Sequence, residues 1–210
     1  MMSQLSIGQK APSFRLPAAQ GGEVGPEDYE GRRNLILFFA KGIACGFCRQ
    51  KMSQLARGAP RFQALDTDIV MIAPTTPERG RFYARNFSLP FPYLCDPDYR
   101  VFEAYGMTVR QHSLVWKTRV FAHAMSMPKP EATELGAPKP ALGEMVRLFN
   151  DDDLGFFVAD KRGAVRHAST APYFEFEGAK PVGMAAVPST EEIVAVLERC
   201  EGTASQRRPA

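Results

Sequence analysis

Apolar runs and amphipathic stretches alternate along the first half of the chain. The segments 35–40 and 68–73 are apolar except for one leading Asp, which is typical of strands buried on both faces of a parallel or mixed sheet. Between them, apolar residues recur over 45–65 at steps of three, four or seven, the spacing of an amphipathic helix. We expect that helix to kink or break near Gly58 and Pro60.

Two further helices are marked by their start signals. Thr76 stands directly before a proline, a favourable N-cap and first-turn pair, and predicts a helix over 77–87. A short strand at 92–95 precedes Asp96, which caps a short helix that Gly106 ends. The order strand, helix, strand, helix indicates an α/β layer fold.

The stretch 107–150 has a different character. It contains four prolines between residues 128 and 140, and we predict a long insertion with little regular structure around 127–140. Such long loops are often lids or contact surfaces. A polar loop at 151–155 should then lead into a hairpin with strands at 156–160 and 164–167.

The two ends of the chain complete the expected organisation. Residues 1–34 form an N-terminal extension, and 171–188 form a Pro- and Gly-rich loop. Ser189 opens a capping box, Ser-Thr-Glu-Glu, ahead of the last helix. We predict one domain over 1–200 and a disordered tail at 201–210.

Composition narrows the class of protein. Apolar residues make up 45% of the 210 residues and charged residues 23%, as in ordinary globular proteins. The net charge of +3 gives no strong field for nucleic acid or anionic lipid, so we expect neither partner. The start of the chain lacks a basic and apolar leader, and no run approaches the roughly 20 residues of a membrane span. We therefore expect a cytoplasmic protein.

The candidate chemistry lies in Cys45-Gly46-Phe47-Cys48, directly after a buried strand and at the start of a helix. The free N–H groups and the positive dipole end of a helix stabilise a negative sulfur, and the thiolate is the reactive form. We expect Cys45 to attack, with Lys41 adding positive charge nearby. Cys48 lies almost one turn further on, more deeply buried, and is the natural resolving thiol.

Other roles for these residue types carry less weight. Half of a zinc site would need two further ligands, and neither the remaining cysteines nor the histidines form a second close pair. We expect no metal and no cofactor. Single cysteines beside apolar residues are usually small buried hydrophobes, which we predict for Cys95 and Cys200. We expect surface or loop roles for His112, His123 and His167.

Four segments support a family resemblance: Ile7–Leu16, Leu37–Cys48, Leu89–Gly106 and Phe156–Gly163. In combination they resemble the alkyl hydroperoxide reductase and thiol-specific antioxidant family, the peroxiredoxins, in a branch that carries Cys-x-x-Cys. The resemblance implies a thioredoxin-like fold, a central mixed sheet flanked by helices, with the long insertion before the final hairpin. It also implies that Cys45 and Cys48 reduce peroxides or disulfides.

Some positions depart from the pattern of standard members. Those members carry Pro and Thr at the places of Phe38 and Gly42 when counted from Cys45, or of Lys41 and Cys45 when counted from Cys48. They also carry a later Arg at the place of Leu154. Thioredoxins carry a cis-proline in the stretch that includes Asp153. Besides a plain polar loop, we consider the hypothesis that the Asp153 charge faces Cys45 and opposes its thiolate.

Three functions follow for the sequence. The first is a peroxiredoxin-like antioxidant oxidoreductase that reduces peroxide through a Cys45/Cys48 dithiol–disulfide cycle, restored by a thioredoxin-like or glutathione-like thiol donor. The second is a thiol–disulfide oxidoreductase acting on protein disulfides. The third is a non-catalytic binding module that uses the insertion 107–150. A homodimer is compatible with each of them.

Overall fold

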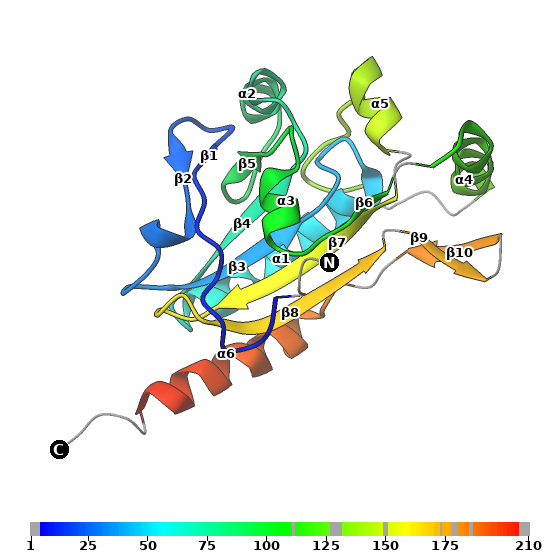
Figure 1. Ribbon diagram of the computed structural model, residues 1–210. Coiled ribbons are helices and arrows are strands. Elements are labelled where there is room, and N and C mark those ends of the chain that lie inside the picture. Colours follow the sequence, from blue (N-terminus) through cyan, green and yellow to red (C-terminus); the bar gives the residue numbers. More distant parts are fainter. Residues whose placement is uncertain are drawn as a thin grey trace.

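The computed structural model describes residues 5–110, 112–126, 132–148, 151–172, 174–177, 180–184 and 187–205. At its centre is a six-stranded sheet in the order β5-β4-β3-β7-β6, with β8 paired to β7 (Figure 1). Strands β3, β4 and β5 are parallel, whereas β7 runs antiparallel to β3, β6 and β8. The predicted α/β fold with a central mixed sheet is confirmed. The strands are β3 (Asn34–Phe39), β4 (Thr67–Ala73), β5 (Tyr93–Cys95), β6 (Val109–Arg110), β7 (Asp151–Ala159) and β8 (Val165–Pro172).

Helices flank this sheet, and two small two-stranded sheets lie outside it (Figure 1). The helices are α1 (Gly46–Gln63), α2 (Pro77–Asn86), α3 (Arg100–Ala104), α4 (Leu114–Ser126), α5 (Leu142–Leu148), α6 (Thr190–Ser205) and the 3-10 helix η1 (Pro26–Asp28). The small sheets pair β1 (Leu16–Pro17) with β2 (Glu23–Val24), and β9 (Phe174–Glu177) with β10 (Lys180–Met184).

Strand β3 is buried along its whole length because helices cover both faces of the sheet. Ile36 and Phe38 pack in the cluster that holds the apolar side of α1 and of α6. Leu35, Leu37 and Phe39 point to the opposite face and pack against α3. Figure 1 shows α3 in front of the sheet and α1 behind it. The alternation along a strand thus divides an unbroken apolar run between two cores.

The helix caps that the sequence predicts are present in the structure. The Thr76 hydroxyl accepts a hydrogen bond from the Arg79 N–H at the start of α2. The Asp96 carboxylate accepts from the first three N–H groups of α3. Ser189 and Glu192 exchange hydrogen bonds between side chain and backbone at the start of α6, as a capping box requires.

Helix α1 differs from the expectation of a break. It continues through Gly58 and Pro60 to Gln63. Gly58 packs closely, since a Cβ there would lie 2.8 Å from the Phe62 ring. Phe62 is fully buried in the cluster shared with α6. Packing of this apolar side therefore outweighs the hydrogen bond that Pro60 cannot donate.

The prediction of a polar loop at 151–155 is wrong, because these residues belong to β7. Asp152 and Asp153 are 1% and 6% exposed. Their carboxylates have partners on distant segments: the Tyr99 hydroxyl for Asp152, and the Thr108 N–H and Arg110 for Asp153. Buried charges are tolerated in a strand when they are paired in this way.

The insertion contains more regular structure than expected. Strand β6 and helices α4 and α5 lie within 107–150, whereas 132–140 has neither helix nor strand, as predicted. Residues 127–131 lie outside the described residues. The hairpin at 156–167 is confirmed, with both strands longer than predicted.

The expectations for the C-terminal part are corrected in two places. Within the predicted loop 171–188, strands β9 and β10 form a second hairpin. Helix α6 extends to Ser205, so the first half of the predicted tail is helical. The rest of that tail, 206–210, lies outside the described residues.

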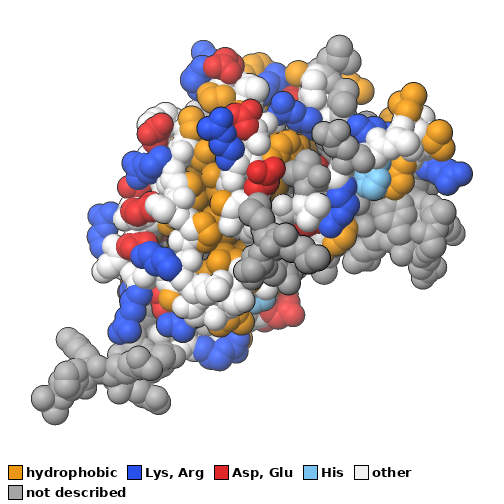
Figure 2. Space-filling model, in the orientation of Figure 1, with side chains coloured by type: hydrophobic (Ala, Val, Ile, Leu, Met, Phe, Trp, Pro, Cys, Tyr) orange, Lys and Arg blue, Asp and Glu red, His pale blue; other side chains and the backbone are white. Residues whose placement is uncertain are grey.

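Charge and hydropathy of the folded chain add two findings. On the face drawn in Figure 2, basic and acidic side chains intermingle over the described surface, in keeping with the net charge of +3. Among the described residues, no helix is both long and apolar enough to cross a bilayer.

Candidate redox site

Cys45 is the N-cap residue of α1. Strand β3 ends at Phe39, a short loop follows, and Cys45 has extended backbone angles (φ −79°, ψ 119°) before the helix begins at Gly46. Its Sγ accepts a hydrogen bond from the Cys48 N–H, at a distance of 3.4 Å between nitrogen and sulfur. The sulfur therefore occupies the place where a capping oxygen would stand, facing the positive end of an 18-residue helix.

The two cysteine side chains are neighbours, and neither forms a disulfide. Cys45 is 7% exposed and Cys48 2% exposed. Burial, together with the adjacent Cys45, raises the pKa of the Cys48 thiol well above its ordinary value, while the N–H and charge of Lys41 act in the opposite direction. A thiol that stays protonated suits a resolving role, because it reacts only once its partner has been oxidised.

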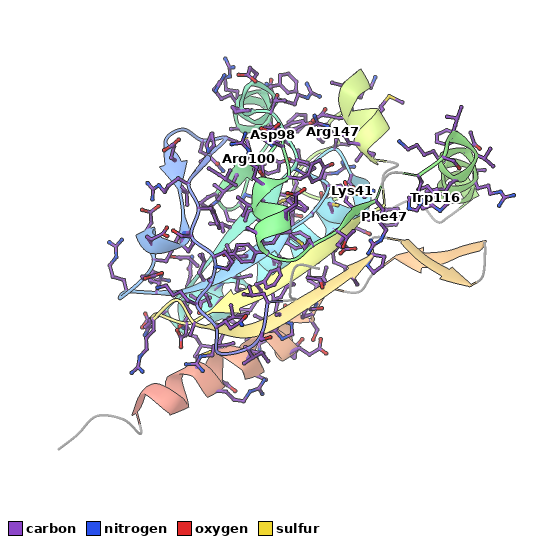
Figure 3. All side chains as sticks on the ribbon, viewed as in Figure 1. Lys41, Phe47, Asp98, Arg100, Trp116 and Arg147 are labelled. Carbon is purple, nitrogen blue, oxygen red and sulfur yellow. The ribbon has the colours of Figure 1, made fainter. Side chains whose placement is uncertain are left out.

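Lys41 is almost buried beside this pair. The residue is 8% exposed, and its Nζ donates a hydrogen bond of 2.9 Å to the Leu148 carbonyl at the end of α5. Figure 3 shows Lys41 and Phe47 on the side of the molecule that carries α4 and α5. The structure thus brings Lys41, Cys45 and Cys48 together, and which sulfur attacks first remains a prediction.

Buried hydroxyl groups hold the loop before Cys45. Gly42 has φ of +108°, and a Cβ on it would lie 2.6 Å from the Tyr93 hydroxyl and 3.3 Å from the Thr75 hydroxyl. Tyr93 and Thr75 hydrogen-bond each other at 2.7 Å, and the Tyr93 hydroxyl also interacts with the Ile43 backbone. The place where standard family members carry Thr is therefore filled by side chains from β5 and from the end of β4.

A cation holds the other side of the same loop. The Arg49 guanidinium donates to the carbonyls of Ile43 and Ala44 at 2.7 and 3.2 Å. Neither Arg49 nor the pair Tyr93 and Thr75 was expected from the sequence. Arg49 lies four residues after Cys45, so its spacing was the one available signal, whereas the two hydroxyl groups come from remote segments.

The hypothesis for Asp153 does not fit its surroundings. Its carboxylate is paired with Arg110 and the Thr108 N–H, so it is not an uncompensated charge. The next residue, Leu154, packs in the cluster that contains Cys45. An apolar side chain from β7 therefore belongs to the same core cluster as the two sulfurs.

The other cysteines show no comparable arrangement. Cys95 is 1% exposed, and burial raises its pKa to about 12. Cys200 is half-buried on α6, with its thiol donating to the Val196 carbonyl. Cys95 fits the predicted role of a small buried hydrophobe, whereas Cys200 is only half-buried.

The histidines are dispersed. His112 stacks on Trp116 at 3.8 Å between ring centroids, and His167 packs against Phe156 with its pKa lowered by burial. The His123 side chain lies outside the described residues. Within the described part of the chain, no group of three or more His, Cys, Asp or Glu side chains is placed to hold a metal ion.

Comparisons with known proteins identify the family of the chain. The model of the AhpC/TSA family matches residues 7–127. A putative peroxiredoxin of Mycobacterium tuberculosis is 34% identical over 104 residues, which is 50% of this chain and 66% of the relative. Peroxiredoxin Bcp of Escherichia coli is 30% identical over 125 residues, 60% of this chain and 79% of the relative.

The fold is shared over almost the whole chain. The crystal structure of peroxidoxin BcpB from Mycobacterium tuberculosis matches with a TM-score of 0.54 at 15% sequence identity, covering 98% of this chain and 100% of that one. The expected thioredoxin-like fold is confirmed. Because the family model takes in more than half of the sequence, the protein belongs to the AhpC/TSA family.

Proposed function

We propose that the protein is a thiol peroxidase that cycles between a Cys45/Cys48 dithiol and a Cys45–Cys48 disulfide. The observation that carries this proposal is the N-cap position of Cys45, whose sulfur accepts a backbone N–H at the positive end of α1. The family and the named peroxiredoxins among the relatives support the same chemistry. The matched stretch takes in just under two thirds of the first of these relatives, so substrate and partners belong to the proposal.

The proposed catalytic cycle has three steps. The Cys45 thiolate attacks the terminal oxygen of a hydroperoxide; an S–O bond forms, the O–O bond breaks, and the alkoxide takes a proton to leave as an alcohol or water. The Cys48 thiol then attacks the sulfenic acid, which forms the disulfide and releases water. Two thiols of a donor finally return two electrons and two protons by thiol–disulfide exchange.

The donor is proposed as a thioredoxin-like protein or a glutathione-like thiol. A dithiol that must be reduced in every cycle fits the reducing cytoplasm. Because Cys45 and Cys48 belong to one chain and lie side by side, the cycle needs no second subunit. A homodimer is therefore compatible with the proposal but unnecessary for it.

The test is rapid mixing of the reduced protein with hydrogen peroxide, followed by quenching and thiol counting by mass spectrometry. We expect Cys45 and Cys48 to be lost together and rapidly, while Cys95 persists. In Cys48→Ser, the same treatment should leave a Cys45 sulfenic acid that a dimedone probe captures. Cys95→Ala is the matched control and should behave as the wild type. Inert Cys45 and Cys48 would contradict the proposal.

Two observations favour disulfide exchange as the second candidate. A side chain at Gly42 would meet the Tyr93 hydroxyl, and Leu154 packs in the same apolar cluster as the two sulfurs. The polar groups that standard members use around a peroxide are thus absent from these two positions. If disulfide exchange is the activity, Cys48→Ser should accumulate mixed disulfides with protein substrates and remain unaffected by peroxide.

A further inference from the structure

The Glu144 carboxylate on α5 binds two side chains of α2. Glu144 accepts hydrogen bonds from the Tyr83 hydroxyl at 2.6 Å and from the Arg79 Nε at 2.9 Å. It also accepts from the Ala141 N–H at the start of α5. The paired side chains of Arg79 and Glu144 are only 22% and 16% exposed, so this ion pair is shielded from solvent far more than an ordinary surface pair.

The far end of α5 lies against the redox site. Arg147 donates a 2.6 Å hydrogen bond to the Pro74 carbonyl, just after β4. The Leu148 carbonyl accepts from Lys41 Nζ, in the loop that leads to Cys45. Figure 3 labels Lys41 and Arg147 and shows both near α5. The final carbonyls of a helix carry partial negative charge, which attracts an ammonium group.

We propose that Glu144 is a positioning residue for the redox pair: it docks α5 on α2, and α5 in turn holds the Lys41 ammonium beside Cys45 and Cys48. This inference rests on the proposed function, because it assigns a purpose to the charge of Lys41. A lysine side chain has several rotatable bonds, and its position is costly to fix without a partner. The Leu148 carbonyl of the docked α5 is such a partner.

The chain offers a matched control for this contact. Glu134 belongs to the same segment of the insertion, but its carboxylate binds the Ser53 hydroxyl on α1 at 2.7 and 2.8 Å. Replacing it by Gln removes a comparable charge from the segment without touching α5. A milder version of the test is Tyr83→Phe, which removes one hydroxyl from the Glu144 network and keeps the ring.

The experiment measures the alkylation rate of Cys45 and Cys48 by iodoacetamide against pH in the reduced, full-length protein, with mass spectrometry of the peptide that contains both. We expect Lys41→Met to move the pH midpoint upward by about one pH unit and Glu144→Gln by about half as much. The double variant should match Lys41→Met alone, since both changes act through the same ammonium. Tyr83→Phe should move the midpoint upward slightly, and Glu134→Gln should not move it.

The outcomes separate the inference from the proposed function. An effect of Glu144→Gln that adds fully to that of Lys41→Met, or an unchanged midpoint in both Glu144→Gln and Tyr83→Phe, overturns the positioning role. In either case the proposed function is tested separately, by peroxide consumption in the wild type. A midpoint that none of these variants moves removes the role of Lys41 as well. Circular dichroism and thermal unfolding of each variant establish that the fold is intact.

Discussion

Cys45 follows the parallel strand β3, Cys95 ends the parallel strand β5 of the same sheet, and both are almost fully buried. Cys45 caps a long helix, and its sulfur accepts an N–H. Cys95 ends its strand with Gly80 of α2 so close that a Cβ there would lie 2.6 Å from the sulfur. Burial raises the pKa of Cys95 to about 12.

The comparison separates the burial of a thiol from the groups that surround its sulfur. Low exposure alone produces an inert side chain that fills space, as at Cys95. A reactive thiol needs, in addition, groups that favour its anion. In the function proposed above, the helix terminus and the charge of Lys41 supply such groups around the Cys45/Cys48 pair.

The largest expected difference concerns activity. Cys45→Ser should lower the rate of peroxide consumption by about four orders of magnitude or more, because the nucleophile itself is lost. Cys95→Ala should retain the rate of the wild type. A peroxidase assay with the natural range of thiol donors measures both. Equal losses in the two variants would contradict the contrast between the two sites.

Alkylation sharpens the same contrast. With a pKa of about 12, Cys95 carries a thiolate fraction of roughly 10⁻⁵ at pH 7, on the order of a thousandfold less than an ordinary thiol. Iodoacetamide should therefore leave Cys95 unmodified in the native protein and label it only in denaturant. Mass spectrometry after a time course provides the readout. Labelling of Cys95 ahead of Cys45 would show that the helix terminus does not decide reactivity.

The loop before Cys45 should be sensitive to a single methyl group. In Gly42→Ala, the alanine would have to adopt a φ of +108°, and its Cβ would lie 2.6 Å from the Tyr93 hydroxyl. Because both are unfavourable, we expect the free energy of unfolding to fall by about 2 to 4 kcal/mol.

Chemical denaturation tests this, with Gly143→Ala on α5 as the control. Nothing lies within 4 Å of a Cβ at Gly143, and an alanine in a helix stabilises by up to about 1 kcal/mol. Similar changes in both variants would mean that the loop tolerates the strain.

The smallest expected effect is a dependence of stability on pH. The Cys95 pKa is raised from 9.0 to about 12 in the folded chain, so folding favours the protonated thiol. Its contribution is fully present below pH 9 and is lost progressively toward pH 12. Between pH 9 and 10 the free energy of unfolding should fall by about 1 kcal/mol more in the wild type than in Cys95→Ala. Parallel slopes for the two proteins would contradict the shift.

Local signals in the sequence were sufficient for much of the fold. The apolar runs give β3 and β4, Thr76 and Ser189 mark helix starts, and the Cys-x-x-Cys spacing places Cys45 at a helix terminus. Each of these depends on residues within one or two turns of each other, where spacing and propensity decide the structure.

The features that escaped prediction depend on contacts between remote segments. The sequence around Asp152 and Asp153 is typical of a loop, and these carboxylates are accommodated in β7 because Tyr99 and Arg110 pair with them. Helix α5 is stabilised by docking on α2 through Glu144, not by its own short sequence. Such tertiary contacts override local propensity and leave no periodic trace in the chain.

The contact between Gly42 and the Tyr93 hydroxyl has an evolutionary consequence. A side chain at 42 would have to displace that hydroxyl and would strain the backbone at a φ of +108°, so it needs both a smaller residue at 93 and a changed loop conformation. In an alignment of relatives, the two positions should therefore covary, with glycine at 42 accompanying tyrosine at 93 and a threonine at 42 accompanying a shorter residue.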